Sequence, residues 1–135
     1  MITGIAHINL IVPEGTLDQA EEFYSGILGF IRVPVPLLQK DRLAWFDITP
    51  KGQQIHIAFG PPEQKSSRHP CFKIDTQGGL LELQRNVWDH HVRGGKAAAL
   101  EADKPGEENS GAKGVEYPSR FFARDYAGNR LEFSL

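Results

Sequence analysis

The sequence predicts an α+β fold made of two βαβββ modules, and three observations lead to that fold class. Short runs rich in β-branched and aliphatic residues alternate with turn residues, and 14 glycines and 9 prolines favour many short strands. Two segments carry apolar residues at helical spacing. The order of one strand, one helix and further strands then occurs twice along the chain. Such a repeat is typical of a duplicated supersecondary unit.

The first module is expected over about residues 1–60. Residues 5–12 are rich in aliphatic residues and predict a strand. A helix should follow over residues 17–28, begun by Thr16 with Gln19 in a capping box and ended by Gly29 in a left-handed conformation. Three more strands are predicted, at residues 30–33, 43–48 and 53–59.

The second module is expected over about residues 69–135, after a proline-rich linker at 60–68. Residues 69–75 predict a strand and residues 80–93 a helix, which two glycines end. The residues near one face of this helix are Leu80, Leu83, Val87, Trp88 and His91. Residues 96–118 indicate a poorly determined strand and a loop. The final hairpin pairs residues 120–125 with 130–135 around the turn sequence YAGN.

The bulk composition suits one globular domain of 135 residues and excludes several function classes. A formal net charge of −2 offers no basic excess for nucleic acid. The single cysteine, Cys71, rules out an internal disulfide. No apolar run approaches the roughly 20 residues of a membrane helix, and the first residues read as a strand and lack the basic region of a signal peptide. We therefore expect a cytoplasmic protein.

Strand alternation places one good metal ligand on each of four predicted strands, opposite the apolar face. Imidazole nitrogen and carboxylate oxygen suit Zn, Ni, Fe(II), Mn or Co. A lone strand histidine is more often a hydrogen-bonded surface or core residue, and a lone glutamate near a chain end is more often solvated. The metal hypothesis rests on all four occurring at equivalent positions of the repeat. They are His7, His56, His69 and Glu132.

Several segments of the chain resemble the vicinal oxygen chelate superfamily. They are GIAHINLIV, EEFYSGILGF, QQIHIAF, RHPCFKI and FFARDYAGNRLEF, which together extend over nearly the whole sequence. That superfamily includes glyoxalase I, methylmalonyl-CoA epimerase, fosfomycin-resistance proteins, extradiol dioxygenases and bleomycin-binding (bleomycin-resistance) proteins. The resemblance implies a single domain over residues 1–135, with a cup-shaped mixed sheet and helices on the outside. Its members commonly form homodimers.

The resemblance also implies a metal site. Family ligands come from the first and fourth strands of each module, which here are the slots of His7, His56, His69 and Glu132. They would hold one divalent metal, Zn, Ni, Fe or Mn. The departure is His56, because glyoxalase I and the epimerase resemble each other in placing Glu or Gln there.

Three functions stay open on the sequence alone. The resemblance implies a glyoxalase-like lyase or isomerase, which acts on a small metal-chelating oxygenated substrate through an enolate-type intermediate, with Glu132 as proton shuttle. The alternative is an extradiol-type dioxygenase, in which His7, His69 and Glu132 hold Fe(II) and His56 acts as acid or base. The third is a small-molecule binding protein without catalysis. Metal content distinguishes the three.

Further residues are candidates for substrate contacts. Asn9 shares a strand face with His7, and one of Trp45 and Phe46 should face the cup. Cys71 and Lys73 share a face with His69, although a small buried cysteine is the plainer reading of Cys71.

Three arginines could clamp a carboxylate or phosphate, or be solvated: Arg120, Arg124 and Arg130. The adjacent pair His90 and His91 favours core or solvent positions over a metal. Residues 104–114 form either a lid or an insertion.

Overall fold

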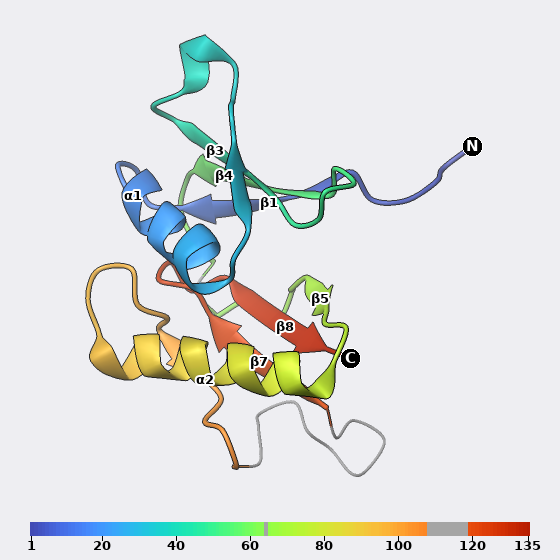
Figure 1. Ribbon diagram of the computed structural model, residues 1–135. Coiled ribbons are helices and arrows are strands. Elements are labelled where there is room, and N and C mark those ends of the chain that lie inside the picture. Colours follow the sequence, from blue (N-terminus) through green and yellow to red (C-terminus); the bar gives the residue numbers. More distant parts are fainter. Residues whose placement is uncertain (64, 108–118) are drawn as a thin grey trace. The chain divides into compact units, whose positions relative to one another are not determined.

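The computed structural model describes residues 1–63, 65–107 and 119–135, and it confirms the α+β fold class. The chain divides into two compact units, Met1–Pro62 and Glu63–Leu135, and the boundary falls inside the proline-rich segment 60–68. Each unit contains one mixed four-stranded sheet (Figure 1). The strand orders are β1-β4-β3-β2 and β5-β8-β7-β6, so the second sheet repeats the topology of the first.

The elements of the first unit follow the predicted order, with strand ends shorter by one or two residues. They are β1 (His7–Val12), α1 (Leu17–Ala20), η1 (Glu21–Ile27), β2 (Ile31–Val33), η2 (Leu37–Gln39), β3 (Leu43–Asp47) and β4 (Gln54–Phe59). The predicted helix is one continuous segment whose second part, η1, has π-helical hydrogen bonding. Gly29 follows it with φ of 78°, as predicted.

The predicted capping box at Thr16 is wrong. The Thr16 side chain makes no capping bond to the helix, and its backbone has φ of −111° and ψ of 29°. Its hydroxyl donates instead to the carbonyl of Pro13, at 2.6 Å. A threonine hydroxyl can bond either the helix amides that follow it or a carbonyl that precedes it, and here it bonds the preceding carbonyl.

The core of the first unit lies between its sheet and its helix. Phe23 and Tyr24 of η1 are fully buried, and the Tyr24 ring centroid lies 5.7 Å from that of Phe46 on β3. Ile55 and Ile57 of β4 are fully buried as well. Because alternate residues of a strand face opposite ways, the residues between them lie on the other face of the sheet.

The second unit contains β5 (Cys71–Lys73), α2 (Gln77–Arg93), β6 (Glu101–Ala102), β7 (Arg120–Arg124) and β8 (Arg130–Ser134). Helix α2 begins three residues before the predicted start, because the Thr76 hydroxyl accepts a capping bond from the Gly79 amide at 3.0 Å. Phe121 of β7 and Phe133 of β8 stack in the core with centroids 4.6 Å apart.

The buried face of α2 is rotated from the predicted one. Its buried residues are Leu80, Gln84, Val87 and His90. Trp88 and His91 are only half-buried. The Gln84 amide turns inward because it donates to the Asp103 carbonyl at 3.2 Å, which apolar periodicity could not foresee.

The predicted strand and loop over residues 96–118 reduce to the two-residue strand β6 within the described part. Most of the predicted lid, residues 104–114, lies outside the described residues. The closing hairpin of β7 and β8 turns at Asp125, a fully buried carboxylate that accepts the amide hydrogens of Ala127 and Asn129. No helix among the described residues is long and apolar enough to span a membrane.

Candidate functional site

A polar row crosses the sheet of the second unit on the face opposite its phenylalanine core. The register pairs Cys71 of β5 with Glu132 of β8, and Glu132 with Phe122 of β7. Glu132 is only 9% exposed. A carboxylate so little exposed requires hydrogen-bonding or charged partners, and His69 and Arg120 both bond it.

His69, which precedes β5, is the first partner of Glu132. Its Nδ1 lies 2.7 Å from the Ser67 carbonyl oxygen, and its Nε2 lies 2.9 Å from Glu132 Oε2. Because a carbonyl can only accept, Nδ1 carries the hydrogen of that bond. The Ser67 carbonyl therefore fixes the imidazole so that Nε2 faces the carboxylate.

Arg120 of β7 is the second partner. Its Nη1 donates to Glu132 Oε1 at 3.1 Å, and the side chains are 18% and 11% exposed. The two carboxylate oxygens are thus divided, one toward the guanidinium and one toward His69. Arg120 stabilises the negative charge while leaving Oε2 available to another cation.

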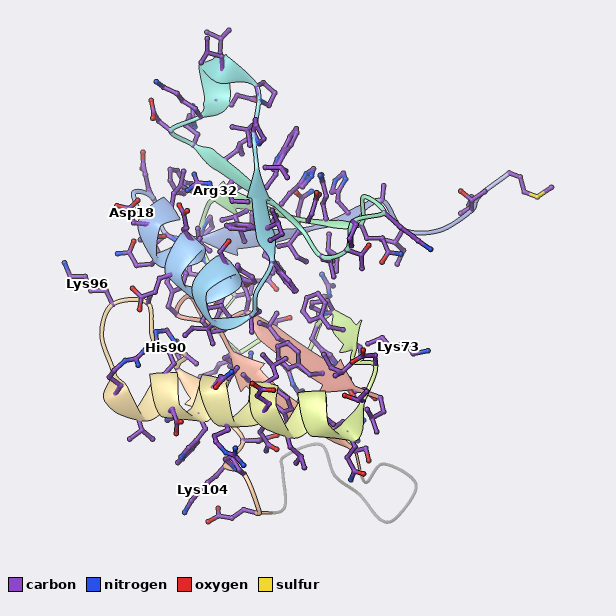
Figure 2. The ribbon with its side chains drawn as sticks, in the orientation of Figure 1. Asp18, Arg32, Lys73, His90, Lys96 and Lys104 are labelled. Carbon is purple, nitrogen blue, oxygen red and sulfur yellow. The ribbon has the colours of Figure 1, made fainter. Side chains whose placement is uncertain are left out.

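Cys71 lies beside this carboxylate and is exposed, so the buried-cysteine interpretation is wrong. Partial desolvation raises the pKa of its thiol, and the charge and hydrogen bond of Glu132 raise it further, while Arg120 opposes the rise. Lys73, on the same strand face, is exposed and extends away from the sheet (Figure 2).

The first unit carries a stack of three rings on its polar sheet face. The register pairs His56 of β4 with both Asn9 of β1 and Trp45 of β3. The His56 ring lies 3.9 Å from the His7 ring and 4.4 Å from the Trp45 ring, at interplanar angles of 10° and 9°. Both faces of the His56 imidazole are therefore covered.

The edge of the His56 ring is held as well. Asp47 accepts a hydrogen bond from Gln54 Nε2 at 2.8 Å, which turns the amide oxygen toward His56 Nε2, also at 2.8 Å. An amide oxygen only accepts, so Nε2 of His56 carries a hydrogen. Burial, and then the neighbouring His7, lower the pKa of His56.

Two of the three candidate arginines are occupied by protein groups. Arg120 bonds Glu132, and Arg124 bonds the carbonyls of Ser66 and Gly128 and the carboxylate of Glu101. Arg130 lies over the Phe122 ring, with 4.4 Å from its guanidinium carbon to the ring centroid.

No protein-family model and no curated protein sequence matches the chain, but solved structures do. A protein assigned to the glyoxalase family from Bacillus anthracis has 26% identity and a TM-score of 0.66, with 98% of this chain and 94% of that chain covered. The fosfomycin resistance protein FosX from Listeria monocytogenes, with Mn(II) and sulfate, has 19% identity and a TM-score of 0.69 over 99% and 90%. A glyoxalase/dioxygenase from Nostoc punctiforme has 21% identity and a TM-score of 0.65, with 96% of this chain and 88% of that chain covered. The last two show the fold alone.

The chain has the fold of the vicinal oxygen chelate superfamily and is similar to a glyoxalase-family protein. Three of the four predicted ligands lie on polar sheet faces, His7 and His56 in the first unit and Glu132 in the second. His69 lies outside the strand predicted for it, because β5 begins only at Cys71, but its ring still reaches Glu132. Among residues 1–63, 65–107 and 119–135, no three His, Cys, Asp or Glu side chains form a group that could hold a metal ion. Each unit presents one pair, and the joint four-ligand set stays a prediction.

The remaining predicted contact residues differ in where they lie. Phe46 is fully buried in the core and Trp45 lies on the polar face, so the structure decides which of the two faces the cup side, a choice that the prediction left open. Asn9 is exposed, and His91 bonds the Ala99 carbonyl at 2.7 Å. Sequence reasoning missed Gln54 and Phe122, although alternation from His56 and from Glu132 would have placed both on these polar faces.

Proposed function

We propose that this chain is a metal-dependent enzyme, a lyase or isomerase of the glyoxalase kind that acts on a small chelating substrate. One observation carries the proposal, the approach of His69 Nε2 to Glu132 Oε2 at 2.9 Å with Nδ1 tied to a backbone carbonyl. Metal-binding histidines almost always donate their other ring N–H to a carbonyl or carboxylate in this way.

The donor chemistry of this pair fits a divalent cation. A hydrogen bond between Nε2 and Oε2 requires a proton between them, and Nδ1 already holds its own hydrogen. A cation bound to both atoms would displace that proton, which is the usual competition between metal and proton at such ligands. Nitrogen and oxygen ligands suit Zn, Ni, Fe or Mn. FosX, whose crystals contain Mn(II), supports a divalent metal in proteins of this fold.

His7 is the ligand that we propose from the first unit, in preference to His56. Parallel rings 3.9 Å apart direct their in-plane lone pairs along parallel lines, which disfavours joint binding of one ion. The His56 ring is further held between His7 and Trp45 and by its bond to Gln54. We therefore propose that His56 orients His7. Because Nε2 of His56 bonds Gln54, only Nδ1 of His56 keeps an in-plane lone pair that could bind a metal as a fourth ligand.

Glu132 is the residue that we propose for proton transfer. A bound divalent cation would supply Lewis-acid stabilisation of the negative charge that develops on a substrate oxygen. Glu132 would take a proton from the substrate carbon and return it, which requires a carboxylate held within hydrogen-bonding reach. Arg120 keeps that carboxylate in place through Oε1, and the low exposure of Glu132 limits competition from water.

The test is metal content together with turnover. Protein purified without chelator should contain about one divalent metal per chain, by mass spectrometry. His69→Ala and His7→Ala should lose both metal and activity on a panel of hemithioacetals. His91→Gln is the matched control, because His91 bonds the Ala99 carbonyl and lies on α2. Full metal content in His69→Ala would refute the assignment.

A dioxygenase is the second candidate, and the ring stack favours it. If His56 is committed to Trp45, His7 and Gln54, the ligand set has two histidines and one carboxylate. Such a set leaves positions open for a diol and oxygen on Fe(II). Oxygen consumption with catechols in the iron-loaded protein, and no turnover of hemithioacetals in the zinc-loaded or nickel-loaded protein, would select this function.

A further inference from the structure

The unengaged arginine of the second unit lies beside the proposed metal ligands. Among the described residues the Arg130 guanidinium has no hydrogen bond and no ion pair, and its contact is the face of Phe122 at 4.4 Å. Arg120 and Arg124, on the same sheet face, are already bonded to protein acceptors. Arg130 can therefore offer all its N–H donors to a ligand, whereas each of its neighbours already uses at least one.

A cavity of about 300 Å³ opens at this position. Its lining consists of residues at β6, β7 and β8, namely Glu101, Ala102, Asp103, Phe122, Ala123, Arg124 and Arg130. The cavity lies wholly within the second unit and is large enough for a small organic anion.

The two acids that line the cavity are bonded to other groups. Glu101 pairs with Arg124 at 3.3 Å, and Asp103 Oδ2 accepts the Phe122 amide hydrogen at 2.8 Å. Neither bond involves the guanidinium of Arg130. A ligand anion at Arg130 would therefore not have to displace a protein carboxylate.

We propose that Arg130, whose guanidinium lies over the Phe122 ring, is a carboxylate-binding subsite that determines specificity. The planar N–H edge of a guanidinium matches the two coplanar oxygens of a carboxylate, and among the described residues no protein acceptor occupies that edge of Arg130. This inference rests on the proposed function, because the carboxylate that Arg130 would bind is part of the substrate of that enzyme.

The position of Arg130 sets the size of that substrate. Arg130 lies two residues before Glu132 on β8 and faces the same way, a step of about 7 Å along a strand. A molecule that reaches both residues carries its chelating oxygens and its carboxylate a few bonds apart. The substrate class is accordingly a short oxygenated carboxylic acid.

The test uses three probes of matched size on metal-free protein, namely propionate, propionamide and ethylphosphonate, titrated by NMR at low salt. Propionate should give saturable shifts around Phe122, and propionamide should bind about tenfold more weakly or worse. Arg130→Gln should lose propionate binding by the same factor. Arg93→Gln, an exposed arginine on α2, should bind like the wild type.

Each other outcome overturns the inference. Equal propionate binding by Arg130→Gln and wild type, or no saturable binding to wild type, removes the subsite. Tighter binding of ethylphosphonate than of propionate refutes the carboxylate class. If Arg130→Gln does not fold by its amide spectrum, Arg130→Lys keeps the charge without the planar edge and should still weaken propionate binding severalfold; unchanged binding there also refutes it.

Metal content measured on the same proteins separates this inference from the proposed function. Arg130→Gln should keep the metal of the wild type, because Arg130 is not a proposed ligand. Absence of metal from the wild type would refute the proposed function, whereas the propionate titration does not depend on metal.

Discussion

Glu132→Gln should weaken metal binding because of the way Arg120 would orient the new amide. Arg120 Nη1 donates to Glu132 Oε1 at 3.1 Å, and a guanidinium only donates. The amide oxygen of the variant must therefore face Arg120, which turns its NH₂ toward His69 Nε2. A neutral His69 can accept that hydrogen, so the fold keeps its bonds. The atom offered to a cation is then an amide nitrogen, which is not a metal ligand.

The size of the loss follows from the cost of flipping the amide. To bring its oxygen to the metal, the variant must give up a hydrogen bond to a charged donor, worth about 1.5–3 kcal/mol. That free energy corresponds to a metal affinity lower by about 10- to 100-fold, since 1.4 kcal/mol is tenfold. Proton-transfer turnover should fall by about 10² or more, because the amide is not a base.

The assay is a double-mutant cycle with Arg120→Gln. Metal affinity is measured by competition with a chromophoric chelator for the wild type, both single variants and the double variant. Without Arg120 the amide can turn freely, so Glu132→Gln should cost less affinity in the Arg120→Gln background than in the wild type. Equal losses in both backgrounds would refute the orientation argument, and unchanged affinity in Glu132→Gln would remove the carboxylate from the ligand set.

Three further predictions follow from single contacts, and a fourth follows from the resemblance to the superfamily. Partial desolvation and then Glu132 raise the pKa of Cys71, so Glu132→Gln should speed alkylation of this exposed thiol by iodoacetamide near pH 8; an unchanged rate contradicts the contact. The pKa of His56 is lowered from 6.5 by burial and then by His7, so the unfolded chain takes up this proton first. The free energy of unfolding of metal-free protein should then fall as the pH drops below 6.5, and fall less in His56→Gln, by urea titration. Asp125→Ala leaves two amide hydrogens without their acceptor and should cost about 2–5 kcal/mol in urea unfolding, with Asp125→Asn milder. Light scattering should give a homodimer, twice 15.0 kDa, and a monomer mass at micromolar concentration would contradict it.

The topology was predictable because the apolar residues of the helices and strands recur at helical spacing or at every second position. Alternation along β4 assigned Ile55 to the core and His56 to the other face, as observed, and along β3 it placed Trp45 and Phe46 on opposite faces without deciding which is buried. Helix ends depended on which carbonyl or hydroxyl lies nearest, so Thr76 was missed as a cap and Thr16 was wrongly chosen. The alternative hydrogen-bond partners of such a hydroxyl lie within a few ångströms of one another, and the spacing of apolar residues does not predict which one it bonds.

The candidate site was predictable in its residue types and less so in their roles. Strand phase predicted that His69 and Glu132 would share a face, but it could not show that the Ser67 carbonyl orients the imidazole. The three arginines looked equivalent in sequence. Only their contacts distinguish Arg130, which lies on a ring, from Arg120, which bonds a carboxylate.

The two units repeat one strand order but place different chemistry on it. In the first, the imidazole of His56 is covered by two rings and bonded to a neutral amide, which disfavours its protonation. In the second, His69 faces a carboxylate that a guanidinium already supports. Surroundings of the first kind hold a nitrogen donor in one orientation, and surroundings of the second kind hold a carboxylate within hydrogen-bonding distance of an imidazole. If the chain is an enzyme, substitutions in the ring stack should therefore alter metal affinity more than the pH profile of turnover. Substitutions around Glu132 should alter both.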